Sequence, residues 1–287
     1  MYGTLEKFIE IWIKEYLDIL SNIVPEYNQI DEKIREQHFE LSLKLISTIT
    51  SRESAKHKHL SKEQVLRKLN SCIENPSDYK FNTEAFVLLS GNLKHNKIVE
   101  LFKPLNIDLN GKLKINQTFI QYCQEKRQIK NLANLQADFL YEKINDLVER
   151  RNEISHGSEV IENILSHSVL EDYTQFLENY CQAIFEILTE EVVKHESVHK
   201  FQKIENVIDV FNHKILAFKI ENYELKVGDV IIMETAEGRF FKKTILEIQL
   251  DNKSYPQITI KNKTKVAVRV KPTIKKNQKF YVKIYES

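Results

Sequence analysis

The sequence contains few of the residues that break a chain or cross-link it. Its 287 residues include six glycines, five prolines and three cysteines. Scarce glycine and proline favour long regular elements over a loop-rich fold. Cys72, Cys123 and Cys181 are odd in number and widely spaced, and no CxxC pair occurs. We therefore expect neither a disulfide framework nor a thiolate metal site.

Long apolar runs are also missing. No stretch approaches the roughly 18 residues that a membrane-spanning helix needs. The first turns carry Glu6, Glu10 and Glu15 instead of the basic and then apolar pattern of a signal peptide. The sequence therefore predicts a soluble, cytoplasmic protein with no membrane partner. Its hydrophobic content of 42% is sufficient for a folded core, and its length favours two domains.

The formal net charge of +1 conceals an uneven distribution of charge. Residues 203–287 contain 17 Lys and Arg against 10 Asp and Glu, a net charge of +7. The remaining residues contain 25 basic and 31 acidic side chains, a net charge of −6. A basic C-terminal part suggests a polyanionic partner, but lysine-rich surfaces also keep domains soluble. Both interpretations stay open at this point.

The first 200 residues have the apolar spacing of helices, and the third helix opens with a capping box formed by Ser61 and Gln64. Trp12 is expected in the core, and residues 105–130 are expected to be irregular or mixed, with a turn at Asn110-Gly111. Helices are predicted over residues 4–22, 31–50, 61–73, 131–154 and 168–195.

After Lys200 the apolar period changes from 3.6 to 2, which is typical of strands. Short turns separate them, indicating a small closed β-barrel. The predicted fold class is thus multidomain α + β, with an all-α helical bundle over residues 1–200 and a small antiparallel β-barrel over residues 201–287. Strands are predicted over residues 207–211, 215–220, 229–233, 243–248, 257–260, 266–270 and 279–284.

The strongest candidate site lies at the end of the predicted helix 131–154. Arg151 lies about 20° from Leu140 around an ideal helix, in the middle of an apolar stripe. A guanidinium on an inward-facing stripe is costly unless it meets an anion, a partner chain or a cleft. This anomaly singles out Arg151. The stripe consists of Leu140, Ile144, Leu147 and Ile154.

His156 follows Arg151 by five residues, so the two lie about 140° apart on an ideal helix and do not meet. Asn152 and His156, four residues apart, do. Gly157 suits a left-handed C-cap, which would unwind the helix end and redirect His156. Alternatively, Arg151 and His156 meet across a two-fold axis between two chains. A third interpretation is that His156 only places favourable positive charge at a helix C-terminus.

The segment Arg151-Asn-Glu-Ile-Ser-His-Gly157 resembles the Arg-x4-His motif of HEPN ribonucleases. The preceding residues 144–151 are similar to theirs as well. Gly91-Asn-Leu93 before a short helix, and residues 5–17, extend the similarity over residues 1–200. Together these features resemble the RiboL-PSP and MAE-type HEPN branch of bacterial toxin–antitoxin and antiphage systems.

This resemblance implies a dimeric helical bundle in which both motifs line one cleft. It also implies RNA cleavage without a metal or cofactor, by attack of the ribose 2′-OH on the adjacent phosphate, which leaves a cyclic phosphate and a 5′-OH. His156 would act as general base or acid. Arg151 would bind the scissile phosphate. Asn152 would orient His156 or the phosphate. Glu149 and Glu153 would tune the pKa of His156.

Residues 203–284 resemble the small β-barrel that forms domain two of translation elongation and initiation factors. The similarity includes residues 207–211, 225–231 and 266–270, while Asn277-Gln278 replaces the Gly-Asp of that family. The resemblance implies capture of RNA such as tRNA or rRNA, or of the ribosome; a solubility or oligomerisation module is the alternative. Lysines available for phosphates are Lys242, Lys243, Lys261, Lys263, Lys265, Lys275 and Lys276.

The sequence therefore predicts a metal-independent HEPN-type endoribonuclease that acts as a toxin or antiphage defence effector. Its expected partners are RNA, a second copy of the chain, and a cognate antitoxin or regulatory protein. The alternative is a catalytically silent RNA-binding or protein-binding component, an antitoxin or scaffold, of such a conflict system.

Overall fold

The computed structural model describes residues 1–51, 59–88, 91–156 and 165–284, without the side chains of residues 155 and 156. Two compact units form, Met1–Thr189 and Glu190–Ser287, and the division falls inside the last helix. The domain limits expected from the sequence, 1–200 and 201–287, stay a prediction.

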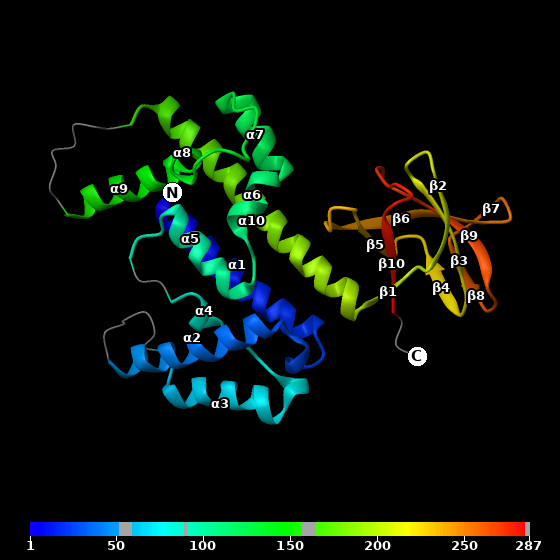
Figure 1. Cartoon of the computed structure of the whole chain (residues 1–287), viewed down its shortest axis with the longest axis horizontal. Helices are drawn as coiled ribbons and strands as arrows, with labels where there is room; N and C mark the ends of the chain where they lie inside the picture. Colours follow the sequence, from blue (N-terminus) through cyan, green and yellow to red (C-terminus); the bar gives the residue numbers. More distant parts are fainter. Residues whose placement is uncertain (52–58, 89–90, 157–164, 285–287) are drawn as a thin grey trace. The chain divides into compact units, whose positions relative to one another are not determined.

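Unit 1 is built from helices (Figure 1). Short 3-10 turns among the described residues are η1 (Tyr27–Gln29), η3 (Pro76–Asp78) and η4 (Lys103–Leu105). The helices are α1 (Tyr2–Ile23), α2 (Glu32–Thr50), α3 (Lys62–Glu74), α4 (Thr83–Phe86), α5 (His95–Phe102), α6 (Leu109–Ile115), α7 (Gln117–Arg127), α8 (Ala137–Leu140), α9 (Glu142–His156) and the greater part of α10 (His167–His199).

Local sequence signals set several of these helices. The stripe of α1 is buried at Leu5, Ile9 and Ile13, which lie at helical spacing. The predicted capping box is confirmed at α3: Ser61 Oγ accepts from the Gln64 N–H at 3.2 Å, and Gln64 Oε1 accepts from the Ser61 N–H at 2.9 Å. Both contacts satisfy amides that the first helical turn leaves unpaired.

Three expectations for this unit are wrong in whole or in part. The helix predicted over residues 131–154 is interrupted, because α8 ends at Leu140 and α9 begins only at Glu142. The turn expected at Asn110-Gly111 lies inside α6, and residues 105–130, expected to be irregular or mixed, contain both α6 and α7. Trp12 is not in the core; its ring stacks on Phe8 at 5.5 Å and lines a surface groove. Trp12 lies at the edge of the apolar face of α1, so the apolar spacing included it although its ring is partly exposed.

Unit 2 is antiparallel throughout, and its main sheet runs in the order β1-β10-β5-β6-β9-β3-β2, with β7 added to β6. A separate pair joins β4 to β8. The strands are β1 (Phe201–Lys203), β2 (Asn206–Phe211), β3 (Ile215–Ile220), β4 (Tyr223–Lys226), β5 (Val230–Glu234), β6 (Phe240–Leu250), β7 (Lys253–Tyr255), β8 (Gln257–Ile260), β9 (Thr264–Val270) and β10 (Lys279–Lys283).

Period-2 alternation directs one face of this sheet to the main core of the unit, and β5 is buried on its other face as well, where Ile232 packs with Val193 and Phe201. Leu216 and Phe218 of β3 face the unit's core, as do Val266 and Val268 of β9. The sheet curves around these side chains as a half-barrel (Figure 1). The predicted fold class, helices followed by a small antiparallel barrel-like domain, is confirmed, but the domain is a half-barrel and not the closed barrel that the strand spacing suggested.

Two buried histidines of unit 1 are held in the neutral form. His38 Nε2 accepts from the Asn82 N–H at 2.9 Å, so it carries no proton, and Nδ1 lies 2.9 Å from the Tyr27 hydroxyl. Burial lowers the pKa of His38 to about 4, and it does the same for His95. Protonation of either ring would place an uncompensated charge in the core.

We predict that unit 1 loses stability on mild acidification. The unfolded histidines have a pKa near 6.5, so between that value and about pH 4 the unfolded state binds more protons. Stability is complete above about pH 6.5 and declines as the pH falls through this window. Urea unfolding, followed by the fluorescence of the lone Trp12, should show a lower midpoint at about pH 5 than at about pH 7.

The matched variant is His38→Gln, whose amide oxygen can still accept from Asn82 but does not titrate. Its midpoint should depend less steeply on pH than that of the parent chain. An unchanged pH dependence would contradict the assignment to His38.

Candidate functional site

Helix α9 is fixed to the unit by its first half. Ile144 and Val148 are fully buried. Asp146 Oδ2 accepts from Arg150 Nε at 2.7 Å and from the Tyr173 hydroxyl of α10. Burial alone would raise the pKa of Asp146, but these hydrogen bonds from Tyr173 and Arg150 lower it. The start of the helix is therefore held by both packing and charge.

The second half of α9 extends past this packing, which corrects the expected apolar stripe. The buried face is Ile144 and Val148, whereas Ile154 is 82% exposed. Arg151 follows Val148 by three residues and stays on the same side of the helix. It is exposed and does not enter the core. Arg151 lies beyond the last buried turn, which explains how a guanidinium is tolerated on the side of α9 that carries Ile144 and Val148.

Uncharged groups hold the Arg151 guanidinium. It lies over the ring of Tyr2 in α1, with 5.5 Å from Cζ to the ring centroid. Arg151 Nη1 donates to Asn92 Oδ1 at 3.4 Å and to Asn152 Oδ1 at 3.3 Å. Two predicted site residues, Arg151 and Asn152, are thus brought together. Tyr2 and the contact with Asn92 were missed by the motif.

The segment before α5 follows α9 along its length. The Leu93 N–H donates to the Tyr2 hydroxyl at 2.9 Å, and the His95 N–H donates to Asn145 Oδ1 at 3.2 Å. Between them, Lys94 forms an ion pair with Glu149. Gly91 starts this segment with φ +90°, a conformation that favours glycine. The resemblance to HEPN ribonucleases included Gly91-Asn-Leu93. It therefore pointed to this segment but did not predict that the segment contacts α9.

His95 is a second histidine near α9, but it belongs to the core. Its ring stacks on Tyr141 with centroids 3.5 Å apart, and its Nδ1 lies 3.0 Å from the Tyr180 hydroxyl. With a pKa near 4 it stays neutral at physiological pH. It therefore positions the start of α5 and is a poor candidate for a general base.

The roles predicted for His156 and for the supporting residues Glu149, Glu153 and Gly157 stay predictions, and the structure shows only where some of them lie. Glu149 is paired with Lys94, and Glu153 is exposed. The helix continues through residue 156, so the unwinding expected at His156 does not occur within α9. The side chain of His156 and all of Gly157 lie outside the described residues. On the helix as observed, positions 151 and 156 are about 140° apart.

The predicted lysines of unit 2 fall into two groups. Lys242 pairs with Glu196 at 2.6 Å, Lys276 pairs with Asp209 at 3.5 Å, and Lys243 Nζ donates to the Pro272 carbonyl at 3.3 Å. Burial lowers the pKa of Lys243. The others are exposed and have no ion-pair partner in the described part of the chain: Lys261, Lys263, Lys265 and Lys275.

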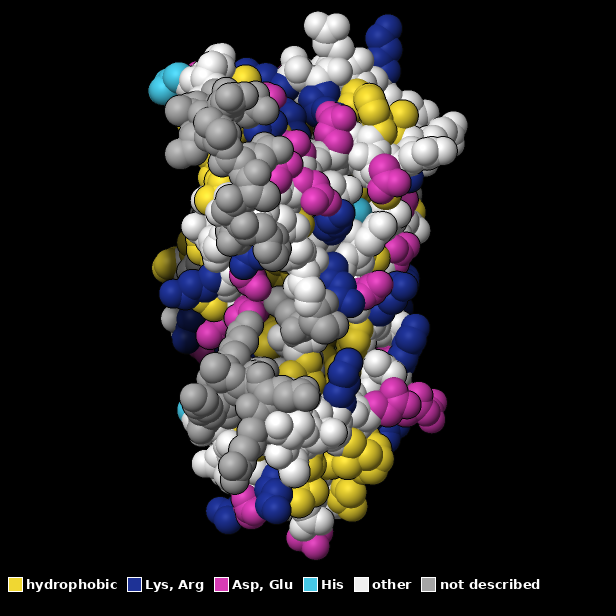
Figure 2. Space-filling model, turned by 90° about the vertical axis from the view of Figure 1, so that its left-hand side faces the viewer, with side chains coloured by type: hydrophobic (Ala, Val, Ile, Leu, Met, Phe, Trp, Pro, Cys, Tyr) yellow, Lys and Arg dark blue, Asp and Glu magenta, His cyan; other side chains and the backbone are white. Residues whose placement is uncertain are grey.

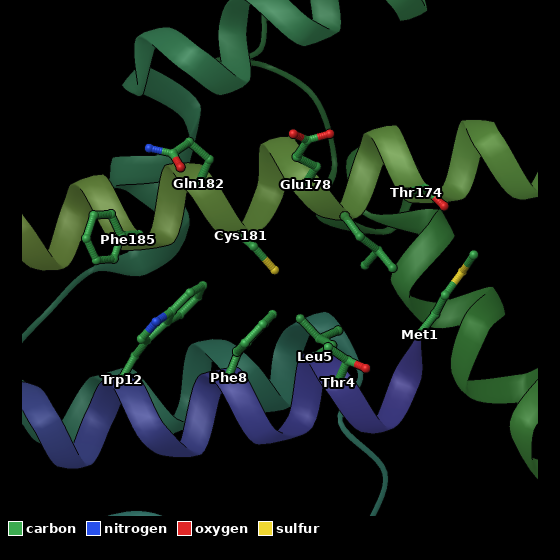
Figure 3. A pocket seen from close by; sticks show the side chains of 11 residues that line it. Met1, Thr4, Leu5, Phe8, Trp12, Thr174, Glu178, Cys181, Gln182 and Phe185 are labelled. Carbon is green, nitrogen blue, oxygen red and sulfur yellow. The ribbon is translucent and has the colours of Figure 1, made fainter.

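An apolar groove lies between α1 and α10, within unit 1 (Figure 3). Phe8 and Trp12 from α1 and Cys181 and Phe185 from α10 point into it, and its volume is about 750 Å³. Phe8 is 44% and Phe185 50% exposed. One end of the groove is formed by Met1, beside the Tyr2 that underlies Arg151.

Elsewhere unit 1 shows paired charges. On the face drawn in Figure 2, basic and acidic side chains are interspersed.

Within residues 1–51, 59–88, 91–156 and 165–284, no group of three or more His, Cys, Asp or Glu side chains could hold a metal ion. No helix in those same ranges is long and apolar enough to cross a membrane.

The contact between Tyr2 and Leu93 can be tested directly. Tyr2→Phe keeps the ring under Arg151 but removes the hydroxyl that accepts from the Leu93 amide. Since such a bond contributes about 0.5–1.5 kcal/mol, exchange of that amide should become roughly 2- to 12-fold faster. Hydrogen exchange read residue by residue measures this, with the His95 amide as internal control. Equal exchange at Leu93 in both proteins would contradict the contact.

Comparisons with known proteins bear mainly on unit 1. No curated protein sequence matches the chain. Among solved structures, GDP-bound aIF5B from Aeropyrum pernix matches with 15% identity and a TM-score of 0.21; the match covers 46% of this chain and 22% of that one. The chain therefore spans less than a quarter of that protein. A family model, RiboL-PSP-HEPN, matches residues 1–190. With its Arg-x4-His segment on α9, the chain belongs to the RiboL-PSP-HEPN family.

Proposed function

We propose that this protein is a metal-independent endoribonuclease whose active site is built around Arg151 and His156. Family membership supports the broader statement, because a HEPN domain suggests a nuclease or RNA-binding role. The narrower assignment to RNA cleavage depends on the state of Arg151. The proposal extends to a role as toxin or antiphage effector, because the sequence resembles the HEPN branch associated with bacterial toxin–antitoxin and antiphage systems.

The observation that carries the proposal is the charge state around α9. The helix has three Lys or Arg residues, and two of them are neutralised: Lys143 by Asp172 and Arg150 by Asp146. Arg151 contacts only uncharged groups, and no acidic partner occurs for it among the described residues. Its positive charge is therefore available to an external anion. A guanidinium offers several donors in a plane and binds phosphate oxygens well.

The proposed reaction needs only groups of the protein and the RNA. His156 takes the proton from a ribose 2′-OH, and the 2′ oxygen attacks the adjacent phosphorus. The bond from phosphorus to the 5′ oxygen breaks, and His156 returns the proton that it took up to that oxygen. Arg151 binds the non-bridging oxygens and stabilises the charge that builds up on them. Asn152, which contacts Arg151, orients the guanidinium.

The geometry of α9 makes a second copy part of this proposal. Positions 151 and 156 diverge on one helix, so Arg151 of one chain would act with His156 of the other. The groove between α1 and α10 is the surface we assign to the dimer, because it is apolar and exposed and adjoins Tyr2. Phe8, Trp12 and Phe185 would then be covered by the partner's groove residues.

Substitution of the two residues tests the chemistry. Arg151→Ala should lower RNA cleavage by about 10²–10³-fold and His156→Ala by about 10²–10⁴-fold. Arg150→Ala, which removes the same charge one residue earlier, should retain cleavage because its partner is Asp146. The measurement is end-sequencing of RNA from cells that express each variant, with purified protein assayed in EDTA.

Loss of cleavage in EDTA would contradict the mechanism while leaving a nuclease possible. No cleavage by the parent chain, with RNA or a second protein still bound, would favour the silent antitoxin or scaffold. As an effector, the parent chain should also arrest growth, and Arg151→Ala should relieve the arrest.

Mixing two inactive variants tests the shared site. In a heterodimer of Arg151→Ala and His156→Ala, a site formed between chains retains one intact Arg–His pair. Random exchange of subunits in a symmetric dimer should then restore roughly a quarter of the parent activity. If each chain supplied both residues of its own site, the mixture would stay inactive.

Phe8→Glu should lower the dimer fraction in light scattering, whereas Phe39→Glu, at an exposed position of α2, should not.

A further inference from the structure

We infer that the outer surface of β3 and β9 in unit 2 binds the phosphate backbone of single-stranded RNA. The inference rests on the register of the two strands, which pairs Lys219 of β3 directly with Lys265 of β9. It extends the proposed ribonuclease by giving its substrate a contact outside the helical unit.

Lys219 and Lys265 lie on the same, outward face. Their neighbours Phe218 and Val266 are buried in the core, and side chains alternate along a strand. Residues directly opposite in an antiparallel pair have Cβ atoms about 4.5–5.5 Å apart, and like charges there are destabilising. The fold therefore maintains a repulsive pair at this position.

Neither lysine forms an ion pair within the described residues, and Asp209, opposite Ala217 on the same face, is paired with Lys276 instead. The residue opposite Lys219 on β2 is Asn206, which is uncharged, and the adjacent Glu205 is already paired with Lys203. Several other cations of unit 2 form ion pairs: Lys226 with Glu224, Arg239 with Glu190, Arg269 with Glu247 and Lys279 with Glu234.

The turn before β9 extends the same charge. Lys261 and Lys263 are exposed between the end of β8 and the start of β9, and they also have no acidic partner there. The four lysines, which we name the β3–β9 lysine cluster, are Lys219, Lys261, Lys263 and Lys265. Further along the same outer face, Phe211 of β2 is 48% exposed opposite Ile215.

This combination fits a single strand of RNA. Closely spaced cations bind successive phosphates and release counterions, and an exposed aromatic ring on the same surface can stack on a base. The occupant would be held mainly by charge, without readout of a particular sequence.

Lys219→Glu gives a sharp test, because it should change stability and binding in opposite directions. The carboxylate introduced at position 219 would face Lys265 as an opposite charge, so the unfolding temperature of unit 2 should rise by roughly 1–5 °C. The affinity for RNA should fall by roughly three- to tenfold. A residue with only a structural role would not lower binding while stabilising the fold.

Binding is measured in the full chain carrying His156→Ala, with a short fluorescently labelled single-stranded RNA titrated at several KCl concentrations. Lys219→Ala should reduce the slope of log affinity against log salt by about 0.7, the value for one lost phosphate contact on a single strand. Lys253→Glu and Lys253→Ala are the controls: Lys253 is exposed on β7 and likewise has no ion-pair partner among the described residues, but it lies opposite Leu250. They should change neither the slope nor the unfolding temperature.

Equal losses of affinity for Lys219→Glu and Lys253→Glu would reduce the effect to net charge and overturn the inference. So would a Lys219→Glu protein that is destabilised, or that binds RNA with the parent salt slope. The outcome is independent of the proposed catalysis. Binding that depends on Lys219 in a chain whose parent never cleaves RNA would refute the nuclease and leave this surface in place.

Discussion

Only the first half of α9 packs against the helical unit, and the position of Arg151 depends on this. Its first two turns are buried through Ile144 and Val148 and tied to α10 by the contacts of Asp146. Its last turns project beyond the core, so Arg151 remains on the side of the packing without being buried. A fully packed helix would have excluded the guanidinium, and an unpacked one would have left it without orientation. The candidate site exists because packing stops between Val148 and Arg151.

Neutral contacts orient the Arg151 guanidinium and leave its charge available, which an ion pair would not. An acidic partner would hold Arg151 more firmly but would compete with a phosphate for its donors. Tyr2 and Asn92 instead restrict the guanidinium through a ring and an amide, interactions worth about 1 kcal/mol or less at exposed positions. The ion pair of Lys94 with Glu149 serves this arrangement, since it keeps the segment that carries Asn92 beside α9. In unit 2 the unneutralised Lys219 and Lys265 follow the same logic.

Local signals allowed much of the fold to be predicted. Apolar periods located α1, α2, α10 and most strands, and the Ser61–Gln64 capping box located α3, because these features depend on neighbours within a few residues. The motif also identified Arg151 and Asn152. The contacts of Arg151 with Tyr2 and Asn92 join residues far apart in the chain, and helix packing alone brings them together. The pairing of Lys219 with Lys265 depends on strand register, which a helix-or-strand pattern does not specify.

The central claim is that a ribose 2′ oxygen attacks the phosphate held by Arg151. The most direct measurement uses a cleaved RNA oligonucleotide and the same oligonucleotide with a single 2′-deoxy residue on the 5′ side of the scissile phosphate. Cleavage at that bond should disappear in the substituted strand and persist elsewhere, and the parent products should end in a cyclic phosphate and a 5′-OH. Continued cleavage at the 2′-deoxy position would contradict the account, because water would then be the attacking group.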